Sequence, residues 1–244
     1  MMKNTNLLTN TLIAHRGLHN IRKGIPENSI AAFKRAINKG YSIELDVHLT
    51  KDKKIVVFHD NTLKRVCGIS KKIEDCTYDE LLIYNLFDTK YKIPLLKEVL
   101  SLIDKKVFLL IETKVLDFNG ELEKELSKIL DSYEGDFAIQ SFNIYSVNWF
   151  KKNKKDYMVG ILSCDFNKQD VGNLKKWILK TLITDIFIKA DFIAYDIKSL
   201  PNMYVNKARK YKKVLGWTIR NKEDYEKAKL YCDGFICENI EELN

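Results

Sequence analysis

Short apolar runs rich in β-branched residues alternate along the chain with longer stretches whose apolar residues recur every three or four positions. Runs of the first kind are typical of buried strands, and stretches of the second kind of amphipathic helices. Eight strands are predicted, at Leu12–His15, Ser42–Asp46, Val107–Thr113, Phe137–Ser141, Met158–Ser163, Phe192–Tyr195, Val214–Thr218 and Gly234–Cys237. Helices are predicted at Asn28–Lys39, Leu95–Ile103, Gly120–Tyr133, Ile144–Asn153, Leu174–Ile186, Met203–Lys212 and Glu223–Leu230. This order predicts an α/β protein, a TIM-type (β/α)8 barrel.

The span from Val47 to Ile93 departs from this repeat. Two β-rich pieces, Val47–Thr50 and Ile55–Phe58, flank a polar connection and predict a β-hairpin after the second strand. A hairpin returns the chain to where it began, so we expect His59 beside Asp46. The residues that follow predict a small helical lid or rim. We therefore expect a hairpin-plus-helix insertion at about 47–93 within a single domain of residues 1–244.

The composition is that of an ordinary globular chain. Of the 244 residues 45% are hydrophobic, and no apolar run approaches the roughly 20 residues that span a bilayer. The first eleven residues lack the apolar core of a signal peptide. Five cysteines form no C-x-x-C pair, which favours free thiols over a zinc site or disulfides. We expect a cytoplasmic protein without a transmembrane segment.

The charge is basic, with 41 Lys and Arg against 33 Asp and Glu, a formal +8. A positive field favours an anionic substrate. The excess is mostly lysine scattered over predicted helix faces, however, and no basic stripe is interleaved with aromatic residues. The sequence therefore predicts a small-molecule partner and no nucleic acid.

Acidic residues stand at the ends of two predicted barrel strands. Glu44 and Asp46 are two residues apart, so their side chains leave an extended strand on the same face and can hold one cation together. Glu112 follows the apolar run Val107–Ile111. Unpaired charge inside a buried parallel sheet is costly, which favours a metal over a solvated face. Carboxylates alone indicate one hard divalent metal, Mg²⁺ or Ca²⁺.

Two histidines and an arginine stand near these carboxylates in the predicted barrel. His15 ends the first predicted strand and His59 ends the hairpin, so one imidazole can accept a proton while the other donates one. Arg16 can fork two N–H donors onto a phosphate. Asp60 either orients His59 or caps the turn. His48 is expected to be a surface or hairpin residue.

Four ordered motifs fall within fifty residues: His15-Arg16, Glu27-Asn28-Ser29 before an apolar run, Glu44-x-Asp46, and His59-Asp60. Together they resemble the glycerophosphodiester phosphodiesterase family. The resemblance implies metal-dependent hydrolysis of glycerophosphodiesters to glycerol 3-phosphate and an alcohol, with His15 and His59 as catalytic acid and base. By itself, Glu27-Asn28-Ser29 is also an ordinary helix start.

Further matches lie downstream. Glu112-x-Lys114 resembles the family's Glu-x-Lys, which implies a third metal carboxylate and a lysine that faces the phosphate. Trp217 in Gly216-Trp217-Thr218 resembles the tryptophan that lines the glycerol pocket. The last predicted strand departs from the family at Cys237-Glu238-Asn239, which affects that rim and the pocket for the alcohol.

Two alternatives stay open. One is a lysophospholipase D or sphingomyelinase D-like phosphodiesterase, which would need an apolar trough. The only candidate for it is Leu81–Phe87, which is better explained as core of the insertion. The other is a catalytically silent module that binds anionic headgroups, against which both histidines and all three carboxylates argue. The preferred alcohol, the nucleophile and the oligomeric state are not determined by the sequence.

Overall fold

The computed structural model describes residues 4–115, 117–165 and 180–243. The chain forms two compact units. Residues Ala14–Phe137 form the first unit, and residues Met1–Ile13 together with Ala138–Asn244 form the second. The short strand β1 (Leu12–Ala14) contains one boundary between them. That the whole chain is a single domain stays a prediction.

In the first unit, two parallel strands carry the acidic residues. β2 (Ser42–Leu49) pairs in parallel with β4 (Leu109–Thr113), which places Asp46 directly opposite Glu112. β3 (Ile55–Val57) pairs antiparallel with the end of β2, with Val47 opposite Val57. The N–H of Phe58 also donates to the carbonyl of Asp46 at 3.0 Å. The chain therefore returns to Asp46 as a hairpin does. That this segment is an insertion in the barrel stays a prediction.

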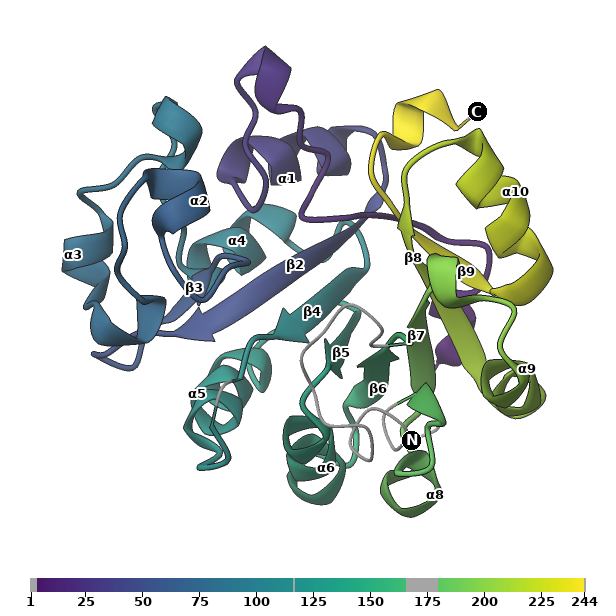
Figure 1. Ribbon diagram of the computed structural model, residues 1–244. Coiled ribbons are helices and arrows are strands. Elements are labelled where there is room, and N and C mark those ends of the chain that lie inside the picture. The colour runs from purple at the N-terminus through teal and green to yellow at the C-terminus, as the bar shows by residue number, and fades with distance from the viewer. Residues whose placement is uncertain (1–3, 116, 166–179, 244) are drawn as a thin grey trace. The chain divides into compact units, whose positions relative to one another are not determined.

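The first unit contains three longer helices and several short ones. The longer helices are α1 (Ile30–Asn38), α4 (Leu96–Ile103) and α5 (Glu121–Leu130). The short elements are α2 (Lys64–Cys67), α3 (Tyr78–Leu81) and the 3-10 turns η2 (Ile21–Lys23), η3 (Ile73–Asp75) and η4 (Leu86–Asp88). α2 lies beside β3 in Figure 1, and Val66 of α2 and Leu81 of α3 share one apolar core with Val56 of β3. Their segment has an apolar core of its own, formed by Val56, Phe58, Leu63, Val66, Ile73, Cys76, Leu81, Leu86 and Ile93.

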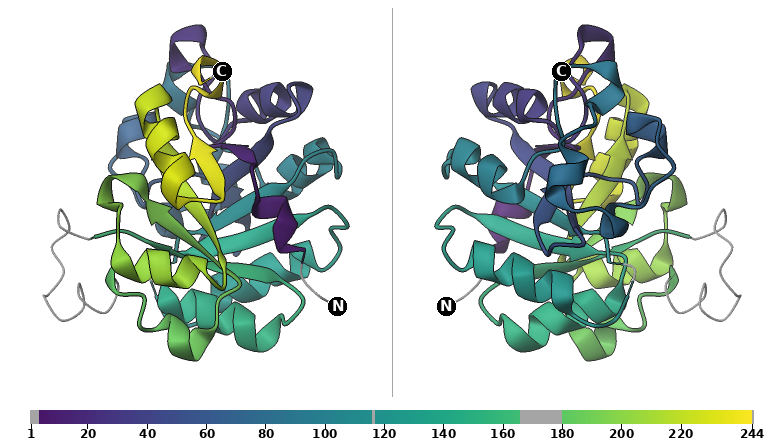
Figure 2. Two further views of the ribbon diagram at one scale, coloured as in Figure 1. Left: turned by 90° about the vertical axis from the view of Figure 1, so that its right-hand side faces the viewer. Right: turned by 90° about the vertical axis from the view of Figure 1, so that its left-hand side faces the viewer.

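The second unit is a run of parallel strands in sequence order. These strands are β5 (Phe137–Ser141), β6 (Met158–Ser163), β7 (Phe192–Asp196), β8 (Lys213–Ile219) and β9 (Gly234–Cys237). The helices are α6 (Ile144–Asn153), α8 (Asp185–Ile188), α9 (Met203–Arg209) and α10 (Lys222–Tyr231), with the 3-10 turns η1 (Thr5–Leu8), η5 (Ile197–Ser199) and η6 (Ile240–Glu242). α9 and α10 pack against β8 (Figure 2). Parallel neighbours joined through helices are the βα repeat predicted from the sequence.

The predicted elements agree closely with the observed ones. β5, β6 and β9 have the predicted bounds, and the other predicted strands differ by at most three residues at an end. The helix predicted at Leu174–Ile186 lies partly outside the described residues, and its last part overlaps α8. None of the helices in the described residues is long and apolar enough to cross a membrane.

Candidate functional site

Three buried carboxylates meet where the middle of β2 lies beside the C-terminal end of β4. One oxygen each from Glu44, Asp46 and Glu112 can be chosen so that all three lie within 4.8 Å of one another. The residues are 1%, 0% and 6% exposed. Glu44 and Asp46 share a face of β2, and the parallel register sets Glu112 opposite Asp46. The structure thus brings together the three residues predicted as metal ligands.

The electrostatics of this acidic cluster fit a divalent cation. Burial and the charges of Asp46 and Glu112 raise the pKa of Glu44 well above its ordinary range. Burial, with Asp46 adding to it, also raises the pKa of Glu112 to about 7 despite the opposing effect of Lys114. Burial would likewise raise the pKa of Asp46, but Lys114, His59 and Arg16 together hold it below its usual range. Two of the three buried carboxyl groups therefore hold their protons more tightly than exposed ones, and a cation bound by this all-oxygen set would compensate their charge.

The turn after β1, which contains His15 and Arg16, is hydrogen-bonded to β2. The backbone N–H of Arg16 donates to Glu44 Oε2 at 2.9 Å, and the N–H of Gly17 donates to the Glu44 carbonyl at 3.2 Å. Gly17 has φ +77°, and a Cβ there would lie 2.9 Å from side-chain atoms of Ala32 and Phe33. Only glycine meets both conditions without strain. The turn therefore fixes the half-buried His15 next to the strand that carries the cluster.

One N–H donor of the Arg16 side chain has no hydrogen-bond acceptor among the described residues. Its Nη1 donates to Glu27 Oε1 at 2.8 Å, and its Nε lies 3.6 Å from Asp46 Oδ2. The buried Nε–H makes no hydrogen bond to any of the residues that the structure describes. A buried N–H without an acceptor is costly, so an anionic ligand here would complete its bonding.

Lys114 lies at the edge of the acidic cluster. Its backbone N–H donates to the Val47 carbonyl at 3.0 Å, just beyond the end of β4. Its Nζ donates to Glu112 and lies 3.0 Å from Asp46 Oδ1. Burial lowers its pKa, but Asp46 and Glu112 more than offset this and raise the pKa above its ordinary value. Lys114 therefore stays charged and contacts the carboxylates directly.

His59 follows β3 and is held by Asp60. Its Nδ1 lies 2.6 Å from Asp60 Oδ1, and its side chain is 30% exposed. Of the two roles open for Asp60, the structure therefore supports contact with His59. Burial lowers the pKa of His59, and Lys114 and Arg16 act in the same direction against Asp46 and Asp60. The imidazole is thus neutral at neutral pH and able to accept a proton.

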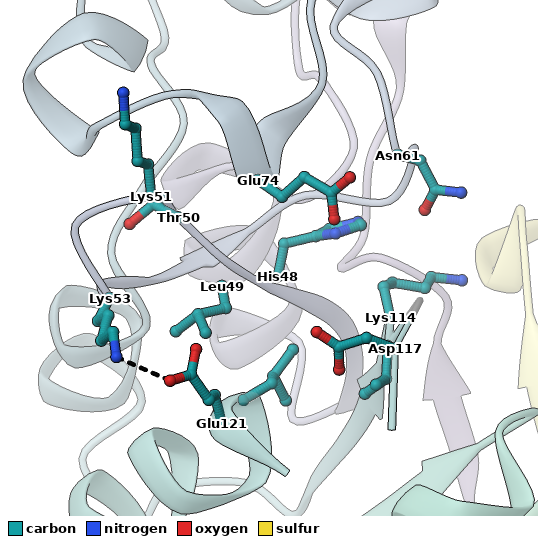
Figure 3. Close-up of a pocket in the computed structure, with 12 residues that line it drawn as sticks. His48, Leu49, Thr50, Lys51, Lys53, Asn61, Glu74, Lys114, Asp117 and Glu121 are labelled. Carbon is teal, nitrogen blue, oxygen red and sulfur yellow. Dashed lines mark hydrogen bonds and ion pairs between the residues drawn. The ribbon is translucent and has the colours of Figure 1, made fainter. Parts of the chain in front are cut away.

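A cavity of about 250 Å³ opens beside Lys114 (Figure 3). Its lining residues are His48, Leu49, Thr50, Lys51, Lys53, Asn61, Glu74, Lys114, Val115, Asp117, Glu121 and Leu122. In Figure 3 Glu74 and Asn61 lie in the upper part of the view, and Asp117 and Glu121 in the lower part. Of the two places predicted for His48, the structure has the hairpin, where His48 lies on β2 opposite Val56 and is only 4% exposed. Lys114 lines the cavity and also contacts Asp46 and Glu112, so it lies between the cavity and the acidic cluster.

Two site residues were missed by sequence reasoning. Asn28, 2% exposed and at φ +52°, donates from Nδ2 to Asp46 Oδ2 at 2.8 Å. Arg65 of α2 bonds both Glu27 and Asp60. The only sequence signal for Asn28 was its place in Glu27-Asn28-Ser29, where Ser29 proves to be the helix cap. Nothing local marked Arg65.

Trp217 belongs to the second unit, where it lies on β8 opposite Asp196 of β7. Its ring meets Phe142 edge to face, with 5.6 Å between centroids. The buried indole N–H forms no hydrogen bond within the described part of the chain. Its part in substrate binding stays a prediction.

A parallel βα protein with buried carboxylates, a histidine and an arginine at its strand ends is typical of barrel hydrolases that act on phosphate esters. The profile of the Glycerophosphoryl diester phosphodiesterase family matches residues 15–242. The chain therefore belongs to this family and is a phosphoric diester hydrolase.

Individual relatives of known name or structure agree with this family assignment. A glycerophosphodiester phosphodiesterase of Caldanaerobacter subterraneus subsp. tengcongensis is 33% identical over 245 residues, which cover 95% of each chain. The crystal structure of a glycerophosphodiester phosphodiesterase from Thermotoga maritima is 26% identical, with a TM-score of 0.73 over 93% of this chain and 94% of that one. An Oleispira antarctica phosphodiesterase, solved with the product sn-glycerol-3-phosphate, is 20% identical, with a TM-score of 0.79 over 96% and 95%. These matches confirm the predicted (β/α)8 barrel.

Proposed function

We propose that the chain hydrolyses glycerophosphodiesters to glycerol 3-phosphate and an alcohol at the acidic cluster, with one divalent cation. The observation that carries this proposal is the meeting of three buried carboxylates with the Arg16 Nε–H, which lies 3.6 Å from Asp46 and makes no hydrogen bond within the described residues. Carboxylates that can hold a cation, beside an arginine donor without an acceptor there, are suited to binding a phosphodiester. Membership of the family supplies the class of substrate.

Glu44, Asp46 and Glu112 would hold the metal, and Asn28 would orient Asp46 through its 2.8 Å hydrogen bond. A bound Mg²⁺ or Ca²⁺ supplies Lewis-acid polarisation of a phosphoryl oxygen and compensates developing negative charge. The Nε–H of Arg16 and the ammonium of Lys114 hold the remaining phosphate oxygens, because both stand at the edge of the cluster.

His15 and His59 carry the proton transfers. One imidazole takes the proton of the attacking hydroxyl as its oxygen bonds to phosphorus. The other gives a proton to the alkoxide that leaves as the second P–O bond breaks. His59 is suited to accept first, because its pKa is lowered and Asp60 holds its Nδ1. The attacking oxygen is either the glycerol 2-hydroxyl or water. Attack by the hydroxyl produces a cyclic phosphate, and water must then break one P–O bond of the ring to give glycerol 3-phosphate, whereas attack by water gives this product directly.

Trp217 would pack against the glycerol, and its indole N–H, which has no acceptor in the described part of the chain, would be available to a hydroxyl group. The polar cavity beside Lys114 suits the alcohol that leaves. In the apolar stretch Leu81–Phe87, Leu81 and Leu86 are core and Phe87 packs on that core, whereas Leu82 and Ile83 are 40% and 72% exposed. The lipid-directed alternative therefore stays open, and the choice of substrate tests it.

Substrate selectivity tests the proposal. Glycerophosphodiesters with different alcohols should show similar kcat/KM, while bis(p-nitrophenyl) phosphate should be far poorer despite its better leaving group, because binding energy from the glycerol orients the reacting atoms. Trp217→Ala should narrow that gap, and Lys114→Ala should weaken both substrate classes. A wild-type preference for the glycerol-free diester, or for a lysophospholipid, would refute the glycerol assignment.

A further inference from the structure

Arg65 connects the two halves of the candidate site. Its Nη1 and Nη2 donate to Glu27 Oε2 and Oε1 at 3.0 and 2.7 Å. Its Nε and Nη2 donate to Asp60 Oδ2 and Oδ1 at 2.7 and 2.9 Å. Four of the five N–H donors of a guanidinium are used in this way. Glu27 and Asp60 therefore each accept two hydrogen bonds from Arg65.

Both carboxylates touch a residue with a proposed role in the reaction. Glu27 Oε1 also accepts from Arg16 Nη1 at 2.8 Å. Asp60 Oδ1 also lies 2.6 Å from His59 Nδ1. The order of contacts is therefore Arg16, Glu27, Arg65, Asp60, His59. Arg65 is the residue that makes one network out of a phosphate-binding half and a proton-transfer half.

The fold fixes Arg65 from its own element. α2 is a single turn, and the flanking Leu63 and Val66, 0% and 5% exposed, anchor it in the apolar core of its segment. The guanidinium also lies over the ring of Phe87, 5.6 Å from its centroid. A lysine would supply a point charge at this place but could not bind two carboxylates bidentately.

The guanidinium of Arg65 is partly exposed, whereas the carboxylates that it binds are largely buried. Its side chain is 43% exposed, and those of Glu27 and Asp60 are 13% and 22% exposed. Bidentate pairs of this kind can stabilise a fold as well as orient the groups that they bind. Separate measurement of kcat and KM distinguishes the two roles, because a purely stabilising contact would not change them selectively.

We propose that Arg65 is a positioning residue for the reaction, which orients His59 through Asp60 and Arg16 through Glu27. This inference rests on the proposed function, because it assigns Arg65 a role only through residues that act there. The hydrogen bonds of Arg65 within the described residues go to Glu27 and Asp60, so its action would be indirect. Its loss should lower kcat through His59 and raise KM through Arg16, while the affinity for the divalent metal stays within about twofold.

The first test compares Arg65→Ala and Arg65→Lys in the metal-loaded enzyme, with Arg22→Ala, an exposed arginine of the same unit, as the matched control. Arg65→Ala should lose about 10- to 100-fold in kcat/KM, as is typical of groups that orient a functional side chain. Guanidinium added at millimolar concentration should restore part of the kcat/KM that Arg65→Ala loses. Arg65→Lys should stay impaired, and Arg22→Ala should match the wild type. Wild-type kinetics for Arg65→Ala, or full activity for Arg65→Lys, would overturn the role.

The second test separates the effect of Arg65 on His59 through Asp60 from its effect on Arg16 through Glu27. In an Asp60→Asn background Arg65→Ala should no longer lower kcat, and in a Glu27→Gln background it should no longer raise KM. Fully additive effects in both backgrounds would refute action through these carboxylates. If His59→Ala and Arg16→Ala retain normal kinetics, the proposed function fails. If they are impaired while Arg65→Ala is not, only the inference on Arg65 fails.

Discussion

Replacing Glu112 by glutamine should change the pH dependence of stability in the metal-free protein. Burial raises the pKa of Glu112 to about 7 from an ordinary value of 4.5. Between these values the folded state binds a proton that the unfolded state has lost, so stability falls as pH rises through this window. At about 1.4 kcal/mol per pKa unit the loss is about 3 kcal/mol, fully present above about pH 7. Glutamine carries no such proton.

The assay is denaturant unfolding of the wild type and Glu112→Gln in excess chelator, followed by circular dichroism. The difference between the two is the quantity of interest. His48, whose pKa burial lowers to about 4, has the opposite pH dependence, and so does His59. Both are common to the two proteins and cancel. Glu44 does not cancel, because the charge of Glu112 raises its pKa in the wild type, and its contribution adds to the difference in the same direction. Relative to wild type, Glu112→Gln should gain about 3 kcal/mol from pH 4.5 to about 7.

With saturating divalent cation, the wild type should be more stable than Glu112→Gln above neutral pH, because the variant has lost a metal ligand. The control is Glu226→Gln, an exposed glutamate whose side chain is 56% accessible, and it should follow the wild type at every pH. A difference between wild type and Glu112→Gln that is independent of pH in chelator would refute the reasoning about the buried carboxylates.

Three further outcomes are expected. His15→Ala and His59→Ala should each lower kcat by roughly two to four orders of magnitude with little change in metal affinity, as measured by calorimetry, and a normal kcat would remove that residue from the mechanism. Asn28→Gly keeps the positive φ but removes the bond to Asp46, and titration should show metal affinity about 10- to 100-fold weaker, whereas unchanged affinity would deny it that role. Gly17→Ala should destabilise the protein by roughly 1–3 kcal/mol in thermal unfolding, because its Cβ would be 2.9 Å from two side chains at φ +77°, and wild-type stability would contradict this.

The strands could be predicted because a parallel strand buried on both faces appears in sequence as an apolar run ending in polar residues. β5, β6 and β9 have the predicted bounds for this reason. The alternation in β2 also placed Glu44 and Asp46 on one face, and the order of the strands placed Glu112 near them. That Asp46 and Glu112 are direct partners depends on the register, which the sequence does not show.

The contacts that complete the site could not be predicted, because they join residues far apart in sequence. Arg65 bonds Glu27 across 38 residues, and Asn28 bonds Asp46 across 18. Arg65 has no local pattern that distinguishes it from a surface arginine. Lys114 was predicted to face the phosphate, and its contacts to two carboxylates depend on the packing of β2 against β4. The role of Trp217 and a cytoplasmic location stay predictions.

The central claim is metal-dependent release of glycerol 3-phosphate at the acidic cluster. Its most direct test is enzymatic detection of glycerol 3-phosphate from glycerophosphocholine, using protein dialysed against chelator and then supplied with Mg²⁺ or Ca²⁺. Release should be absent in chelator and return with the cation. It should stay absent in Glu44→Gln, whereas Glu226→Gln should recover fully. Full turnover in excess chelator after extended dialysis, or normal turnover by Glu44→Gln, would contradict the account.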